Sequence, residues 1–165
     1  MWNDGLRADV QVFNAAIHAC GRSRQWQQVL ALLQAMREQG LDPVLVTYNS
    51  ALAAYAASCR WREAVNLFGS MRRAHVTPDI VTYNSLMNLL EKSGRWDEAL
   101  AVLNDVQTAG LEPDVVTYGT AINACKEGGL WLKALELLEE MPQRGVQPNV
   151  VVATAAMSAC GKSGQ

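Results

Sequence analysis

The stretch Asp79-Ile80-Val81-Thr82-Tyr83-Asn84 decides the fold, because near-copies of it return at a fixed step along the chain. Val44-Leu45-Val46-Thr47-Tyr48-Asn49 stands thirty-five residues earlier, and Asp114-Val115-Val116-Thr117-Tyr118-Gly119 stands thirty-five residues later. Weaker copies occupy residues 10–14 and 150–154. A step of this length is typical of repeat proteins, in which each small unit packs on its neighbours.

Other landmarks keep the same step. The recurring residues are Trp26, Trp61, Trp96 and Trp131; Pro43, Pro78, Pro113 and Pro148; and Met36, Met71 and Met141. Counted from Val10, the full repeats are residues 10–44, 45–79, 80–114 and 115–149. Residues 1–9 look like the tail of a preceding repeat, and residues 150–165 are expected to form the first helix of a partial fifth repeat.

Two helical patterns fill each repeat. In the third repeat, the apolar residues between Val81 and Leu90 share one helical face, and a break follows at Ser93-Gly94. A second pattern runs from Trp96 to near Gly110, and a proline then stops it. The sequence therefore predicts an all-α fold, a right-handed α-solenoid of stacked helix-turn-helix repeats with the first helices lining the concave side.

Local signals mark the helix ends. Asp79, Asp114 and Asn149 precede first helices and are predicted N-caps, because a side-chain oxygen there accepts from unpaired backbone amides. Val44 holds the same position without an acceptor, so its helix should start less firmly, at a cost of about 1 kcal/mol. Glycines follow most second helices, whereas His75 takes that place in the second repeat and predicts either a strained turn or another kind of C-cap.

Composition narrows the class of protein. The 165 residues are half apolar and carry a formal net charge of −2. A slightly negative net charge does not indicate a protein that binds nucleic acid. No apolar run approaches the ~20 residues that cross a bilayer, and no targeting peptide is recognisable in the chain. A membrane association is therefore not expected.

The cysteines indicate packing rather than chemistry. Cys20, Cys125 and Cys160 occupy one repeat position, which Tyr55 and Leu90 fill in the other copies. A position that accepts Cys, Tyr or Leu is an apolar packing position, and no two cysteines have the close spacing of a zinc site. We expect free thiols in a reducing compartment, with no metal and no cofactor.

The chain resembles the pentatricopeptide repeat. Its helix pairs begin with Val-Thr-Tyr-Asn, continue in residues 94–100 with Gly-Arg-Trp-Asp-Glu-Ala-Leu, and end in residues 110–114 with Gly-Leu-Glu-Pro-Asp. The resemblance covers essentially the whole chain in four copies. It implies a solenoid of mitochondria or chloroplasts that acts in organelle RNA processing. Such a solenoid binds single-stranded RNA along a concave groove and reads one base per repeat.

The resemblance also implies site residues. The fifth and last residues of each repeat would choose the base, and the second residue would pack against it. The implied base-reading residues are Asn14, Val44, Asn49, Asp79, Asn84, Asp114, Gly119, Asn149 and Thr154. The implied base-packing residues are Val46, Val81, Val116 and Val151, with Gln11 a departure from the pattern.

Base preferences follow from the same resemblance. Asn with Asp implies U, so the second and third repeats imply a U-U step. Gly119 with Asn149 implies at most a weak A, because Gly119 has no side chain to read a base. Asn14 with Val44 implies a pyrimidine without a choice between C and U. Thr154 leans toward a purine.

A physical argument also supports base reading by the fifth and last residues. The fifth residue lies in the first turn of a first helix and the last residue lies just before the next one, so stacking should bring them close. Asn carries donors and an acceptor that can address a base edge. The alternative is that Asn serves only the helix start and that Asp79 and Asp114 are only N-caps. We favour base reading because both residue types recur together in consecutive repeats. The tryptophans, by contrast, are interpreted as core rather than as base-stacking residues.

Phosphate contacts are the weakest part of this interpretation. The candidates lie near the ends of first helices and are Arg22, Lys92, Lys126 and Lys162. Ala57 and Glu127 stand at similar places, so the basic lining is thin. RNA affinity should therefore be modest and easily lost with salt.

Two functions remain open. The first is a sequence-selective single-stranded RNA-binding module; the alternative is a non-catalytic protein-binding or structural scaffold in a larger ribonucleoprotein assembly, which the net charge favours. We expect no enzyme, because His18 and His75 stand in different repeats and no catalytic motif is present. The partial repeats at both ends also predict self-association through uncapped apolar faces.

Overall fold

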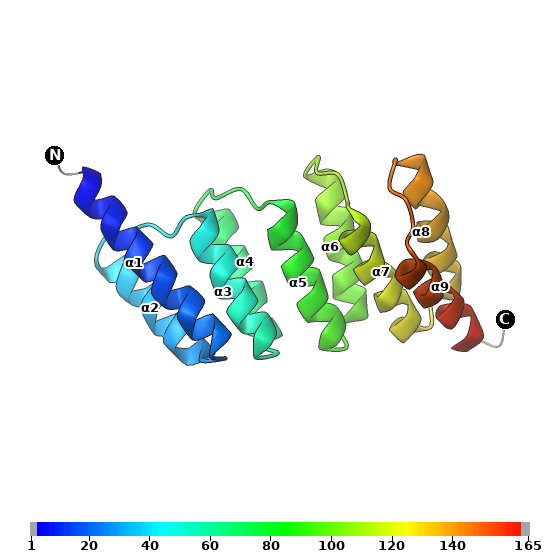
Figure 1. The fold of residues 1–165 in the computed structure, drawn as a ribbon, viewed down its shortest axis with the longest axis horizontal. Coiled ribbons are helices and arrows are strands. Elements are labelled where there is room, and N and C mark those ends of the chain that lie inside the picture. Colours follow the sequence, from blue (N-terminus) through cyan, green and yellow to red (C-terminus); the bar gives the residue numbers. More distant parts are fainter. Residues whose placement is uncertain (1–2, 163–165) are drawn as a thin grey trace. The chain divides into compact units, whose positions relative to one another are not determined.

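A computed structural model describes residues 3–162 of the chain, with side chains described for residues 9–161. Within that range every regular element is a helix and there is no β-strand (Figure 1). The helices are α1 (Asn3–Arg22), α2 (Trp26–Glu38), α3 (Leu45–Ala57), α4 (Trp61–Arg73), α5 (Ile80–Lys92), α6 (Trp96–Thr108), α7 (Val115–Gly128), α8 (Trp131–Gln143) and α9 (Val150–Lys162). The prediction of an all-α fold of helix pairs with a 35-residue step is confirmed.

The chain divides into two compact units, Met1–Pro78 and Asp79–Gln165. In the first unit, α1 packs on α2 and α3, and α3 packs on α4. In the second unit, α7 packs on α5 and α6 as well as on α8 and α9. First helices therefore contact first helices inside each unit, as Figure 1 shows for α1 beside α3 and for α7 beside α9.

Helix α1 differs from the sequence prediction at its start. It begins at Asn3 and includes residues 5–9, which the repeat step assigns to the tail of a preceding repeat. The equivalent stretches elsewhere carry Pro43 or Pro113, whereas Ala8 stands here. Without a proline, no amide is missing and no ring restricts the preceding residue, so the helix continues through the stretch.

The helix starts follow the predicted caps. Oδ1 of Asp79 accepts from the Thr82 amide at 2.8 Å, and Oδ1 of Asp114 accepts from the Thr117 amide at 2.8 Å. Oδ1 of Asn149 accepts from the Val152 amide at 2.9 Å. The predicted N-caps are therefore confirmed. Val44 makes no side-chain cap hydrogen bond at the start of α3.

The turns after the second helices require left-handed backbone. Gly40 and Gly110 have φ angles of 70° and 72°, and His75 adopts 55° at the same repeat position. Of the two alternatives for His75, the strained turn is therefore the one that forms. A side chain in this region costs about 1 kcal/mol relative to glycine.

The core lies between paired helices. At the repeat position that holds three of the cysteines, Tyr55, Leu90 and Cys125 are buried and Cys20 and Cys160 are half-buried, which indicates a packing position. Burial raises the pKa of the Cys125 thiol to about 11. Helix packing also buries Ala64, Ala99 and Ala134 and the recurring Met36, Met71 and Met141 completely.

The tryptophans are only partly core, which corrects the sequence interpretation. Trp26, Trp61, Trp96 and Trp131 are all half-buried. The guanidinium carbon of Arg60 lies 4.2 Å from the centroid of the Trp26 ring. A cation over the ring face stabilises the Trp26 side chain although it is only half-buried.

Candidate nucleic-acid interface

Two of the predicted base-reading residues contact each other in the second unit. Asn84 lies in the first turns of α5, and Asp114 is the N-cap of α7. Nδ2 of Asn84 donates to Oδ1 and Oδ2 of Asp114 at 3.1 and 3.3 Å. The expectation that stacking brings a fifth residue close to a last residue is met at this pair.

A buried threonine joins the pair and was missed by the sequence analysis. Oγ1 of Thr117 lies 2.7 Å from Oδ1 of Asn84 and 2.8 Å from Oδ1 of Asp114. The same oxygen accepts from the Asp114 amide at 3.2 Å. Thr117 is fully buried, so its hydroxyl depends on these partners. Its recurrence at Thr47 and Thr82 was the available signal, but that recurrence alone does not identify a partner 33 residues away.

Asp114 stays ionised because of this arrangement. Burial acts to raise its pKa, but hydrogen bonds from the amide and hydroxyl of Thr117, from Asn84 and from the Val116 amide together hold the pKa below its ordinary value. The carboxylate is therefore an acceptor at neutral pH, and it stands beside the Asn84 amide.

The first unit repeats the arrangement without the carboxylate. Oγ1 of Thr47 donates to Oδ1 of Asn14 at 2.6 Å and accepts from the Val44 amide at 3.1 Å. Val44 occupies the place of Asp114, and its side chain is 45% exposed. The Val44 side chain has no hydrogen-bond acceptor for the Asn14 amide.

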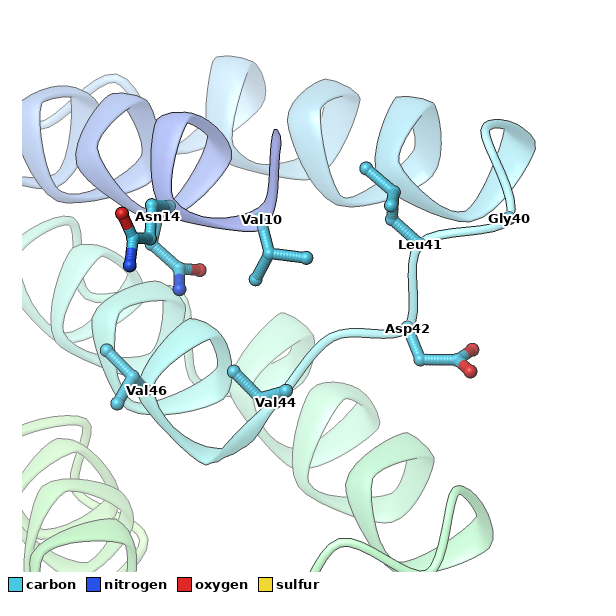
Figure 2. Close-up of a pocket in the computed structure, with 8 residues that line it drawn as sticks. Val10, Asn14, Gly40, Leu41, Asp42, Val44 and Val46 are labelled. Atoms are coloured by element: carbon cyan, nitrogen blue, oxygen red, sulfur yellow. The ribbon is translucent and has the colours of Figure 1, made fainter. Parts of the chain in front are cut away.

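A cavity of about 600 Å³ opens at this pair. It is lined by Val10, Gln11, Asn14, Gly40, Leu41, Asp42, Val44 and Val46 (Figure 2). The cavity is therefore lined by the predicted base-reading residues Asn14 and Val44 and by the predicted packing residue Val46. Gln11, which departs from the packing pattern, lines it as well. Volumes in this range are typical of small-ligand sites.

The remaining predicted base-reading residues are described separately, because their surroundings differ from those of Asn84 and Asp114. A Cβ on Gly119 would lie 3.3 Å from Cγ2 of Val152, so a larger residue there would press on α9. Oγ1 of Thr154 donates to the Val150 carbonyl oxygen at 2.6 Å, within its own helix. Asn49 and Asp79 belong to different units, and their pairing stays a prediction.

The packing valines form an exposed apolar row on the second unit. Val81, Val116 and Val151 in the second unit are each more than half exposed, and so is Val46 in the first. A single exposed valine is ordinary, but the same exposure at one repeat position in successive helices marks a surface built for contact.

The predicted phosphate-contacting residues lie at the opposite end of the first helices. Arg22 and Lys92 are exposed in the last turns of α1 and α5. Nζ of Lys126 pairs with Oε1 of Glu127 at 3.3 Å, which offsets part of its charge. The side chain of Lys162 lies outside the described residues. Lys92 follows Asn84 by eight residues, which is about 12 Å along the helix axis.

Two other kinds of functional feature, a metal site and a membrane-spanning helix, were considered among the described residues. No group of three or more His, Cys, Asp or Glu among them could hold a metal ion. No described helix has the length and apolar composition that crossing a membrane requires.

Comparisons with known proteins agree with this geometry. The model of the PPR repeat family matches residues 43–88 and 78–127, that of the pentatricopeptide repeat domain matches 1–58, and that of the PPR repeat matches 116–146. No curated protein sequence matches the chain.

Solved structures provide the spatial comparison. The pentatricopeptide repeat protein PPR10 in complex with an 18-nt psaJ RNA element is 32% identical, with a TM-score of 0.78 over 93% of this chain and 23% of that one. A structure of the pentatricopeptide repeat protein PPR10 from maize has a TM-score of 0.71 at 32% identity, over 92% of this chain and 22% of that one.

A more distant structure shares the fold alone. The PPR domain of Arabidopsis thaliana protein-only RNase P 1 in complex with tRNA is 18% identical, with a TM-score of 0.82 over 93% of this chain and 81% of that one. The repeat step, the helix pairs and the matching family models together show that the chain belongs to the pentatricopeptide repeat family.

Proposed function

We propose that this chain binds single-stranded RNA and reads one base at each junction between neighbouring repeats. The observation that carries the proposal is the cavity of about 600 Å³ between α1 and α3. Asn14, Val44 and Val46 line it, and the family pattern assigns these residues to base reading and packing. A planar base could enter with its face against valine and its edge toward Asn14.

The second unit supports the proposal with a different chemistry. At Asn84 and Asp114, an ionised carboxylate stands next to an amide. A carboxylate accepts hydrogen bonds and therefore suits a base whose ring nitrogen carries a hydrogen, as N3 of uracil does. This supports the proposal of U at the third repeat, and U at the second repeat stays a prediction from the resemblance. A relative 32% identical to this chain is itself in complex with RNA.

The wider role follows the family. We propose a non-catalytic module that acts in RNA processing in a mitochondrion or chloroplast. Protein partners and self-association through the apolar face of α9, where Val151 and Met157 are exposed, remain predictions of the sequence. Sedimentation at high protein concentration tests the latter.

The test is a specificity change at one position. Wild type and Asn84→Thr are titrated with two oligonucleotides that carry U or G opposite the third repeat and are otherwise identical. In the family that the chain resembles, threonine with aspartate implies G. Wild type should therefore prefer U and the variant should shift toward G, by about 1–3 kcal/mol in the difference. Asn104→Thr makes the same chemical change on an exposed part of α6 and should leave the ranking unaltered.

A second candidate function has one observation in its favour. The net charge is −2, and Lys126 is paired with Glu127, so phosphate attraction is weak. A protein-binding scaffold in a ribonucleoprotein assembly would need no such attraction. If wild type binds neither oligonucleotide at low salt, or if Asn84→Thr and wild type rank them alike, the scaffold replaces base reading.

A further inference from the structure

The second helices of the two units differ at one repeat position, which Ser70 holds in α4 and Glu140 holds in α8. In the second unit, Oε1 of Glu140 accepts from Nε2 of Gln107 at 3.3 Å and from the Tyr118 hydroxyl at 3.1 Å. Arg144, just after α8, forms an ion pair with the same carboxylate. The carboxylate of Glu140 therefore joins α6, α7 and the end of α8.

The first unit keeps donors at the equivalent positions but has no carboxylate between them. Arg37 stands at the repeat position of Gln107, and its Nη2 lies 3.4 Å from Oγ of Ser70, near the limit of a hydrogen bond. Tyr48 stands at the repeat position of Tyr118 and is 1% exposed, and its hydroxyl has no hydrogen-bond partner among the described residues. A buried hydroxyl without a partner is uncommon, so this position lacks an acceptor.

A cavity of about 430 Å³ lies between α2 and α4, and we call it the α2–α4 cavity. Arg37, Ser70 and Arg73 line the part of it near the C-terminal ends of the two helices. Neither arginine forms an ion pair with a carboxylate in the described part of the chain. Glu63 also lines the cavity, but it precedes Ser70 by seven residues, which is about 10 Å along the helix axis. The end of the cavity at Ser70 is therefore positively charged.

Apolar side chains stand beside this charged end. Leu30, Leu33 and Leu67 line the cavity, and Leu30 is 44% exposed. An RNA phosphate group could pair with the arginines, but it has no apolar group to cover the leucines. A peptide that carries an acidic residue beside an apolar one matches both parts of the wall.

We propose that the α2–α4 cavity binds a segment of a protein partner, which inserts a glutamate or aspartate side chain between Arg37 and Arg73. An apolar side chain of the same segment covers the leucines. The inserted carboxylate takes the place that Glu140 holds in the second unit and accepts from Arg37 and from the Tyr48 hydroxyl. The cavity lies on second helices, whereas the predicted base-reading residues lie on or just before first helices. The proposal therefore does not rest on RNA binding.

The first experiment selects peptides from a phage-displayed library of random short sequences, with the 165-residue chain as the target. Selected peptides should share a glutamate or aspartate next to an apolar residue. Their affinity, measured by fluorescence anisotropy, should fall on the order of tenfold when Arg37→Gln and Arg73→Gln are combined, because two exposed charge contacts are lost. Arg62→Gln makes the same change on an exposed part of α4 outside the cavity and should leave the affinity unchanged.

Two further substitutions test the place of the carboxylate. Ser70→Glu supplies a carboxylate from the chain itself, as Glu140 does in the second unit, so it should raise the urea midpoint and abolish peptide binding. Ser70→Gln has the same size without the charge and should not raise the midpoint. Tyr48→Phe removes a hydroxyl that has no partner in the free chain, so it should weaken peptide binding by about threefold without lowering the urea midpoint.

The proposal is overturned if the selected peptides contain no shared acidic residue, or if no peptide is selected. It is equally overturned if the variant that combines Arg37→Gln and Arg73→Gln binds the peptides as tightly as wild type. A lower urea midpoint with unchanged peptide affinity would show that the arginines only stabilise the helix ends. If an RNA oligonucleotide displaces the peptide and loses affinity in the same variant, the cavity contacts nucleic acid and the protein segment is wrong. Failure of base reading at the first helices would leave these results unaffected, so the two proposals fail separately.

Discussion

The hydrogen bond between Asn84 and Asp114 should couple the stability of two neighbouring repeats. Asp114 performs two tasks, because it caps α7 through the Thr117 amide and accepts from Nδ2 of Asn84. Loss of an N-cap costs about 1 kcal/mol. Loss of a hydrogen bond to a charged group costs about 1.5–3 kcal/mol, and the lower end applies here because Asp114 is half-buried. Asp114→Ala should therefore lower the free energy of unfolding by about 2–3 kcal/mol.

A matched control separates the contribution of the hydrogen bond between repeats from the contribution of the N-cap. Asn149 caps α9 through the Val152 amide and stands opposite Gly119, which has no side chain to donate to it. Asn149→Ala should therefore cost only about 1 kcal/mol. In a double-mutant cycle, Asn84→Ala and Asp114→Ala should show a coupling free energy of about 1 kcal/mol.

The assay is urea unfolding followed by far-ultraviolet circular dichroism, with the slope of each transition compared so that a change in cooperativity is recognised. The reasoning is refuted if Asp114→Ala costs no more than Asn149→Ala. It is equally refuted if the coupling free energy between Asn84 and Asp114 falls within about 0.3 kcal/mol of zero.

Three further predictions concern charge, backbone and pH. Lys92→Ala should weaken binding to every RNA sequence alike and reduce the slope of log affinity against log salt by about 0.7, as titrations at several salt concentrations will show. His75→Gly should raise the free energy of unfolding by about 0.5–1 kcal/mol, because glycine adopts a φ of 55° without strain; an unchanged urea midpoint would contradict this. The lowered pKa of Asp114 means that the unfolded chain binds more protons than the folded one, so its stabilisation is present above the ordinary carboxyl range near ~4 and is lost as pH falls through the folded pKa. The difference in free energy of unfolding between wild type and Asp114→Asn should accordingly shrink as the pH falls, and a difference that stays constant with pH would contradict this.

Much of the fold could be predicted because it is encoded locally and then repeated. The spacing of apolar residues predicts which face of a helix is buried. A capping residue such as Asp114 or Asn149 before an apolar run predicts where the helix begins. The start of α1 at Asn3 was not predicted, because the repeat step assigns residues 1–9 to the tail of a preceding repeat. Ala8 lacks the constraint that a proline imposes, and the helix continues through it.

The candidate site could be predicted only in part. The fifth and last residues of each repeat were identifiable from their recurrence, and the contact between Asn84 and Asp114 was expected from stacking. The threonine partners were not, because Thr47 and Thr117 read in sequence as ordinary helix-start residues. Nothing local distinguishes a hydroxyl that serves its own helix from one that bonds an amide on the preceding repeat.

The sequence by itself determined the repeat step, the helix pairs, the caps and the family, since each of these depends on residues within a few turns of one another. The tertiary structure alone decided which polar atoms meet across a junction. It placed Oγ1 of Thr47 within 2.6 Å of Asn14 and opened the cavity beside Val44. Those distances depend on how closely one first helix packs on the next, and the packing is set by all the buried side chains between them rather than by any single position.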